Sequence, residues 1–166
     1  MSGRIKNNNL SLITGCVCAS IQAIVIFTSG NPYTVAHNIG SFDFIPPIWI
    51  WCLTLIIDSF LLGYAFGGVF LESFSGKRRR EAEIRVYQGG MFFIAAYLLS
   101  LAHYPLFFIH QKFVTSCIIA IFALLFSWVC VFFWHRVSIV SCAVMITHSA
   151  WIGYIFFANG YLIFNI

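Results

Sequence analysis

The chain has 166 residues, of which 61% are hydrophobic and only 8% are charged, and its mean hydropathy is +0.92. Soluble globular domains carry about 25% charged residues, so this composition excludes a soluble fold, a disordered chain and a secreted disulfide scaffold, and it indicates an integral membrane protein. Nine Lys and Arg exceed five acidic residues. We interpret this excess as a topology determinant and expect no nucleic-acid partner.

Five apolar segments are long enough to cross a bilayer as helices. The first ends at a turn containing Asn31-Pro32 and is not followed by the small-residue cleavage pattern of a signal peptide. The second begins at Pro46-Pro47, since proline is tolerated in a first helical turn. The third stops near Pro105, and the last two meet in a tight turn at Arg136. We predict a single domain, residues 1–166, that is an all-α integral membrane five-transmembrane-helix bundle in contact with lipid, with spans at about 10–28, 47–71, 86–104, 113–134 and 137–163.

The connections between these spans predict the topology. A connection at 29–45 contains no Lys or Arg, whereas the segment 72–85 is the most hydrophilic in the chain. Lys112 alone lies on one face of the membrane; on the other lie Arg4, Lys6, Lys77, Arg78, Arg79, Arg80, Arg85 and Arg136. We therefore expect a cytoplasmic amino terminus and an external carboxyl terminus. The charge bias and the lack of an organelle-type leader favour a bacterial inner (plasma) membrane.

Asp58 is the most informative residue, because it falls about ten residues into the second span, where a charge costs several kcal/mol. Such an acid must be neutral, paired or next to a wet cavity. Two interpretations are open. Asp58 is either a proton-carrying or ligand-facing carboxyl, or a protonated acid that bonds Thr54 or Ser59 and packs.

His103 and His148 are the other titratable groups near or within spans, and a neutral imidazole could accept from Asp58 or ligate a haem iron. Metal-site spacing is missing, so we expect no metal site and favour packing roles for both histidines. The six cysteines lie inside apolar runs, and we interpret them as buried small hydrophobes. No complete catalytic set is in place, so we do not expect an enzyme.

Small and aromatic residues mark close contacts. Gly63-x-x-x-Gly67 lets another backbone approach, either inside the bundle or between protomers. Interfacial belts explain Trp49, Trp51 and Trp134. Trp151 lies about fourteen residues into the fifth span, too deep for a belt, so its indole either packs or forms a wall for a planar ligand.

Two runs of sequence carry a family resemblance. One, at the start of the second span, is Phe44-Ile45-Pro46-Pro47-Ile48-Trp49-Ile50-Trp51, and the other, at the end of the third, is Pro105-Leu106-Phe107-Phe108. They resemble the second-helix entry and the Trp-Ser-Pro-Leu-Phe-Phe segment of the TspO/MBR family of tryptophan-rich sensory or translocator proteins. Counting on without a gap brings further matches onto family positions: Arg136-Val137-Ser138, Trp151, Asn159 and Phe164-Asn165. The resemblance covers residues 10–166.

The resemblance implies a five-helix bundle, often dimeric, with a pocket under the first loop for tetrapyrroles such as haem or protoporphyrin IX, and for sterols or isoquinoline-type ligands in some members. It implies no obligatory cofactor, and a homodimer is a possible partner. Carried over residue by residue, the pocket includes Pro46, Trp51, Ser100, His103, Trp151 and Ile155, with Leu55 and Ser59 facing it from the second span.

The chain departs from the family pattern at several pocket positions. The family's Leu-Tyr pair aligns with Asp58-Ser59, its Asn-x-x-Trp with Ser100-x-x-His103 and its Pro-Tyr with Thr147-His148. Its first-loop Trp-Tyr and Lys-Pro are replaced by Val35-Ala36 and Ser41-Phe42. Of two tryptophans linked to light-dependent porphyrin breakdown only Trp151 remains, which argues against that reaction. The more polar pocket predicts a smaller ligand or one with a cationic or hydroxyl group.

The favoured hypothesis is a membrane protein that binds a hydrophobic planar ligand and has a sensory, regulatory or transport role. Trp151 would stack on the ligand, while His103, Ser100 and Asp58 supply polar contacts. Two alternatives stay open. One is a small proton-coupled transporter that uses Asp58, and the other is a structural membrane subunit whose pocket is filled by its own phenylalanines.

Overall fold

The computed structural model describes residues 2–29, 46–73 and 79–165, and this part of the chain is helical without strands. The helices, in chain order, are α1 (Ser2–Thr28), α3 (Ile48–Ser73), α4 (Arg79–Tyr104), the π-helix η1 (Pro105–Ile109), α5 (Phe113–Trp134) and α6 (Ile139–Asn165). Five stretches are long and apolar enough to span a membrane: Asn9–Thr28, Ile48–Ser73, Arg80–Ile109, Phe113–Trp134 and Ile139–Phe164. The predicted all-α five-transmembrane-helix bundle is therefore confirmed.

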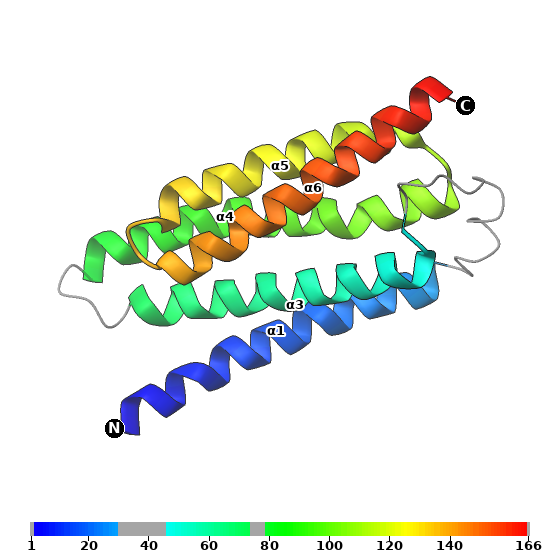
Figure 1. Cartoon of the computed structure of the whole chain (residues 1–166). Coiled ribbons are helices and arrows are strands. Elements are labelled where there is room, and N and C mark those ends of the chain that lie inside the picture. Colours follow the sequence, from blue (N-terminus) through cyan, green and yellow to red (C-terminus); the bar gives the residue numbers. More distant parts are fainter. Residues whose placement is uncertain (1, 30–45, 74–78, 166) are drawn as a thin grey trace.

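The helices lie side by side in two groups (Figure 1). α1 packs along α3, and α5 lies between α4 and α6. α3 joins the groups, because it contacts both α6 and α4. The two ends of the chain lie at opposite ends of the bundle (Figure 1).

α1 approaches α3 closely at the glycines that the sequence singled out. The Thr14 hydroxyl donates to the Gly63 carbonyl oxygen at 2.7 Å. A methyl group on Gly63 would lie 2.8 Å from the Thr14 carbonyl carbon and 2.9 Å from the Cys18 sulfur. The glycine pattern is therefore used inside the bundle, and it gives no support to a homodimer.

We expect Gly63→Ala to destabilise the bundle by about 1–3 kcal/mol, because the added methyl group meets the backbone of α1 rather than a flexible side chain. Thermal unfolding in detergent would measure this loss. Gly153→Ala is the matched control, since nothing lies within 4 Å of a methyl group there. Equal unfolding temperatures for the two variants would contradict the close approach of α1 and α3.

Three predicted helix boundaries differ from the structure. α4 begins at Arg79, inside the segment 72–85 expected as a loop, and helical backbone continues past Pro105 to Ile109. Proline removes a backbone donor and disrupts the regular α-helical hydrogen bonds. The helix continues here as a π turn, in which the bonded residues are five apart: the His110 N–H donates to the Pro105 carbonyl oxygen at 3.0 Å. α6 begins at Ile139, two residues later than expected, because the Ser138 hydroxyl caps it by accepting from the Ser141 N–H at 3.2 Å.

Some predictions fall on residues outside the described ranges. These are the connection 30–45, including Val35-Ala36 and Ser41-Phe42, and the basic residues Lys77 and Arg78. At the amino terminus, the polar stretch expected to precede the first span is part of α1, which begins at Ser2.

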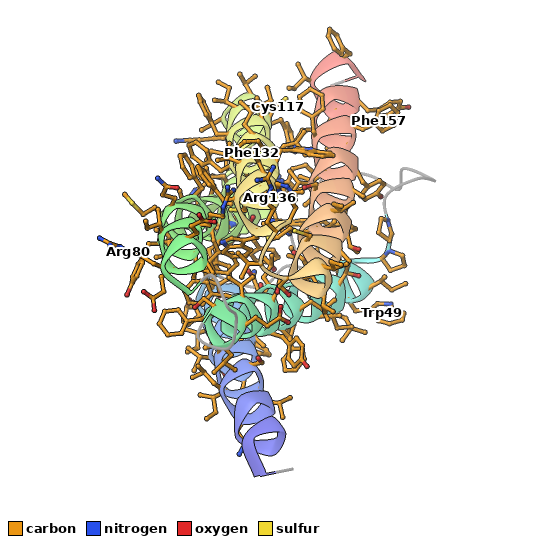
Figure 2. All side chains as sticks on the ribbon, turned by 90° about the vertical axis from the view of Figure 1, so that its left-hand side faces the viewer. Trp49, Arg80, Cys117, Phe132, Arg136 and Phe157 are labelled. Atoms are coloured by element: carbon orange, nitrogen blue, oxygen red, sulfur yellow. The ribbon has the colours of Figure 1, made fainter. Side chains whose placement is uncertain are left out.

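The tryptophans divide into lipid-facing and buried sets. Trp49 is 57% exposed and points outward in Figure 2, as a belt residue should. Trp51 and Trp134, which we also assigned to belts, have no exposed surface. Residues two apart on a helix lie about 200° apart around its axis, so Trp51 must face inward when Trp49 faces out. The belt assignment is thus wrong for Trp51 and Trp134.

The cysteines also divide by exposure. All six thiols are free. Cys130 and Cys142 are buried, as we expected, whereas Cys16 is exposed on α1. The interpretation as buried small hydrophobes therefore does not hold for Cys16.

Candidate functional site

A cavity lies among α3, α4, α5 and α6, in the interior of the bundle. The space inside it that a water-sized sphere can reach is about 20 Å³. One water molecule needs about 10–15 Å³ by this measure, so the cavity in this conformation has room for about one water molecule. The cavity wall consists of Leu55, Asp58, Leu99, Ser100, His103, Ile119, Ala120, Ala123, His148, Trp151, Ile152 and Ile155.

Most of the predicted site residues lie together in this wall. They are Leu55, Asp58, Ser100, His103, Trp151 and Ile155. Trp51 does not line the cavity but packs against Trp151, with 5.4 Å between ring centroids. Ser59 turns toward α1, where its hydroxyl donates to Gln22 Oε1 at 3.3 Å. Pro46 precedes α3 and is not part of the wall.

Asp58 pairs with His148 across the bundle. Asp58 Oδ2 lies 2.7 Å from His148 Nδ1, joining α3 to α6. The His148 side chain is 1% exposed and that of Asp58 is 14% exposed. The proposed packing partners of Asp58 are engaged elsewhere, since the Thr54 hydroxyl donates to the Ile50 carbonyl oxygen at 2.8 Å and Ser59 bonds Gln22. Of the possibilities that the sequence left open, the structure therefore shows the paired acid at a cavity.

His103 occupies the α4 side of the same cavity. Its Nε2 lies 3.3 Å from Asn159 Nδ2, and the Asn159 amide also donates to the Ile155 carbonyl oxygen at 2.8 Å. The ring stacks on Phe107, with 5.4 Å between centroids and 23° between planes. This buried ring is thus fixed by an α6 residue and by the π-helix that follows its own helix.

Aromatic rings close one side of the cavity. Trp151 is half-buried and stacks on Tyr154, with 5.4 Å between centroids and 26° between planes. Behind Trp151, Trp51 stacks on Phe107 at 5.7 Å and meets Phe108 edge-on at 5.3 Å. α3, η1 and α6 therefore meet at a single aromatic cluster beside the cavity.

Three ring nitrogens of cavity-lining residues are buried without a hydrogen-bond partner in the described part of the chain. They are His103 Nδ1, His148 Nε2 and Trp151 Nε1. A buried polar atom that lacks a partner costs about 1–3 kcal/mol, so such atoms need an explanation. Five other buried polar atoms of the described residues also lack a partner, but they belong to residues outside the cavity wall. The grouping of three on the lining residues of one cavity points to a site for a hydrogen-bonding guest.

Sequence reasoning missed one side of this site. His148 was considered as a partner of Asp58, a haem ligand or a packing residue but was not included in the predicted pocket, and the α5 residues Ile119, Ala120 and Ala123 were not considered. The pairing could have been predicted from the sequence, because a buried acid needs a partner and His148 is one of few titratable groups in the spans. The spacing of Ala120 and Ala123 puts both on one face of α5, but similar spacings are common in membrane helices.

The chain matches a known family over nearly all of its length. No curated protein and no solved structure shows a significant match to it. The sequence profile of the TspO/MBR family, however, matches residues 12–164. Since this match leaves out only the extreme ends of the 166 residues, the chain belongs to the TspO/MBR family.

Proposed function

We propose that this protein binds a hydrophobic, planar ligand in the cavity among α3, α4, α5 and α6 and has a sensory, regulatory or transport role in the membrane. Tetrapyrroles such as haem or protoporphyrin IX are the first candidates, followed by sterol-like molecules. The observation that carries the proposal is the set of three unpartnered ring nitrogens on one aromatic-walled cavity. Membership of a family of ligand-binding and transport proteins, rather than enzymes, supports it.

The aromatic wall and the polar groups of the cavity suit such a ligand, but the cavity is too small for it in this conformation. Small-molecule sites are usually about 300–1,000 Å³, whereas this cavity offers about 20 Å³. A tetrapyrrole does not fit this conformation, and we assign no axial iron ligand. Binding would require α5 to move away from α3 and α6, so that the cavity widens while Trp151 stays in its wall.

The proposed setting is a bacterial inner membrane with the amino terminus in the cytoplasm. The start of α4, which contains Arg80, and the connection between α5 and α6, which contains Arg136, lie at the same end of the bundle (Figure 1). The connection between η1 and α5, which contains Lys112, lies at the other end (Figure 1). This distribution supports the proposed orientation, because basic residues are enriched on the cytoplasmic side.

We expect haem and protoporphyrin IX to quench the tryptophan fluorescence of the detergent-solubilised protein saturably, with a Kd in the micromolar range or tighter. The quenching should be clearly weaker in Trp151→Phe, because that variant removes the only tryptophan among the cavity-lining residues of the described chain. Trp128→Phe is the control, since this indole is exposed on the outside of α5.

Equal losses of quenching in Trp151→Phe and Trp128→Phe would contradict a ligand in this cavity. Lack of saturable binding to haem, protoporphyrin IX and a sterol would overturn the proposed function and favour a structural subunit. The family assignment would stand in either case, because it does not depend on the ligand.

A further inference from the structure

We infer that the cavity recognises a carboxylate on its apolar ligand and that the Asp58–His148 pair takes up one proton when this carboxylate binds. The inference rests on the proposed function and narrows its ligand class. Two observations carry it. The three unpartnered nitrogens, His103 Nδ1, His148 Nε2 and Trp151 Nε1, can act as hydrogen-bond donors, and the Asp58–His148 pair can hold a positive charge.

His148 presents a donor to its surroundings when its pair with Asp58 is neutral and shares one proton between Oδ2 and Nδ1. A buried site disfavours net charge, and this arrangement carries none. When this proton is on Nδ1, the ring is an imidazolium and Nε2 also carries hydrogen. When it is on Asp58, the neutral ring carries its hydrogen on Nε2. His148 Nε2–H is therefore a donor in both forms.

His103 and Trp151 add two more donors. Asn159 Nδ2 faces His103 Nε2, so in the hydrogen-bond network Nε2 accepts, and the hydrogen of the neutral ring is assigned to Nδ1. The indole Nε1–H of Trp151 is always a donor. Neither His103 Nδ1 nor Trp151 Nε1 has an acceptor in the described part of the protein.

Three donors without protein acceptors suit an acceptor-only group. A carboxylate offers about four lone-pair sites on two oxygens, which is enough for all three N–H groups. An ammonium group carries only donors and would leave every one of these nitrogens unpaired. The structure thus disfavours the cationic ligand that we considered from the sequence.

A carboxylate also brings a negative charge into the bundle, and the pair can compensate it. A second proton converts Asp58 and His148 to a carboxylic acid and an imidazolium, with a net charge of +1. His103 is the other titratable residue of the cavity wall, and α5 contributes none. The packed helices also carry thiols and phenols, which are ordinarily neutral near pH 7, among them Cys18, Cys52, Tyr97, Tyr104, Cys117, Cys130, Cys142 and Tyr154. The charged residues of α3 and α4 other than Asp58 do not line the cavity; they include Glu72, Arg80, Glu81, Glu83 and Arg85. Asp58 and His148 are therefore the groups suited to take up the proton.

The test compares protoporphyrin IX, which has carboxylates, with its dimethyl ester, which has none. Binding to the whole protein in lipid nanodiscs is measured from pH 6 to 8, and proton uptake is followed with an indicator dye in weak buffer. We expect about one proton per bound acid and an affinity that falls up to about tenfold per pH unit as pH rises. The ester should bind with no pH dependence and without proton uptake.

His148→Gln identifies where the proton goes. This variant keeps an amide near Asp58 but cannot form an imidazolium, so proton uptake and the pH dependence should both disappear. Thr147→Ala, on the exposed neighbouring residue of α6, should keep both. Proton uptake that persists in His148→Gln overturns the assignment, because the proton would then reside on Asp58 alone, on His103 or on the ligand rather than on an Asp58–His148 pair.

The remaining outcomes separate this inference from the proposed function. If acid and ester bind alike, without pH dependence or proton uptake, the carboxylate inference fails and ligand binding stands. If neither binds, the proposed function fails together with the inference. If His148→Gln does not fold, the comparison of acid and ester on the unmodified protein still decides whether binding takes up a proton.

Discussion

Trp51→Ala should lower the free energy of unfolding by about 3 kcal/mol. Truncating a buried Trp costs about 3–5 kcal/mol in soluble proteins, and the lower end applies here because unfolded membrane helices remain in an apolar solvent. Trp51 has no exposed surface, and its ring contacts Phe107, Phe108, Trp151 and Tyr154. Its loss therefore removes packing between α3, η1 and α6 at once. Thermal or denaturant unfolding in detergent micelles measures the effect.

Trp49→Ala is the matched control for this prediction. Trp49 lies two residues earlier on α3 and faces outward. Its truncation should change stability by about 0.5 kcal/mol or less, as is usual for surface positions. Comparable losses in Trp49→Ala and Trp51→Ala would mean that the aromatic cluster does not stabilise the bundle as the structure implies.

His148→Leu should lower the free energy of unfolding by about 2–3 kcal/mol. Removing one partner of a buried ion pair costs about 3–5 kcal/mol, because the other charge is left uncompensated. The effect here should be smaller, since the Asp58 side chain retains 14% exposure and stays partly solvated when its partner is lost. Chemical unfolding in mixed micelles, at pH 7 and constant lipid content, measures the loss.

The Asp58→Leu/His148→Leu double variant completes this experiment. Two apolar side chains of similar size leave no unpaired polar group, so most of the lost stability should return. The double variant should thus be more stable than His148→Leu alone, with a coupling energy of about 1–3 kcal/mol between the two sites. Strictly additive effects would show that Asp58 and His148 do not interact in the folded protein.

The pair also bears on the departures that we inferred from the sequence resemblance. That resemblance sets Asp58 against a Leu and His148 against a Tyr of the family pattern, and the structure places the two side chains 2.7 Å apart. A lone Asp in the second span would be costly, and a lone His in the fifth would have no evident use. Their contact gives a single physical reason for both departures.

The sequence by itself determined the fold class, the number of spans and half of the cavity wall. A bilayer leaves few options, since about 20 apolar residues must form a helix to satisfy their backbone hydrogen bonds. The spacing of the family motifs then brought residues as far apart as Leu55, Ser100 and Trp151 to one site. The same reasoning failed at Pro105, where we predicted the end of the third span and the structure shows a π-helix. Whether a π turn forms depends on how the surrounding side chains pack.

Only the tertiary structure decided which side chains meet. Asp58 and His148 are 90 residues apart, and no local pattern says which helix faces will touch. The position of Trp51 was also decided by tertiary contacts. Tryptophan is enriched at membrane interfaces, so we predicted a belt residue, but the structure buries Trp51 against residues of η1 and α6. In a chain that is apolar on nearly every face, hydrophobicity cannot distinguish lipid from a neighbouring helix, so small residues, polar pairs and ring shapes select the contacts.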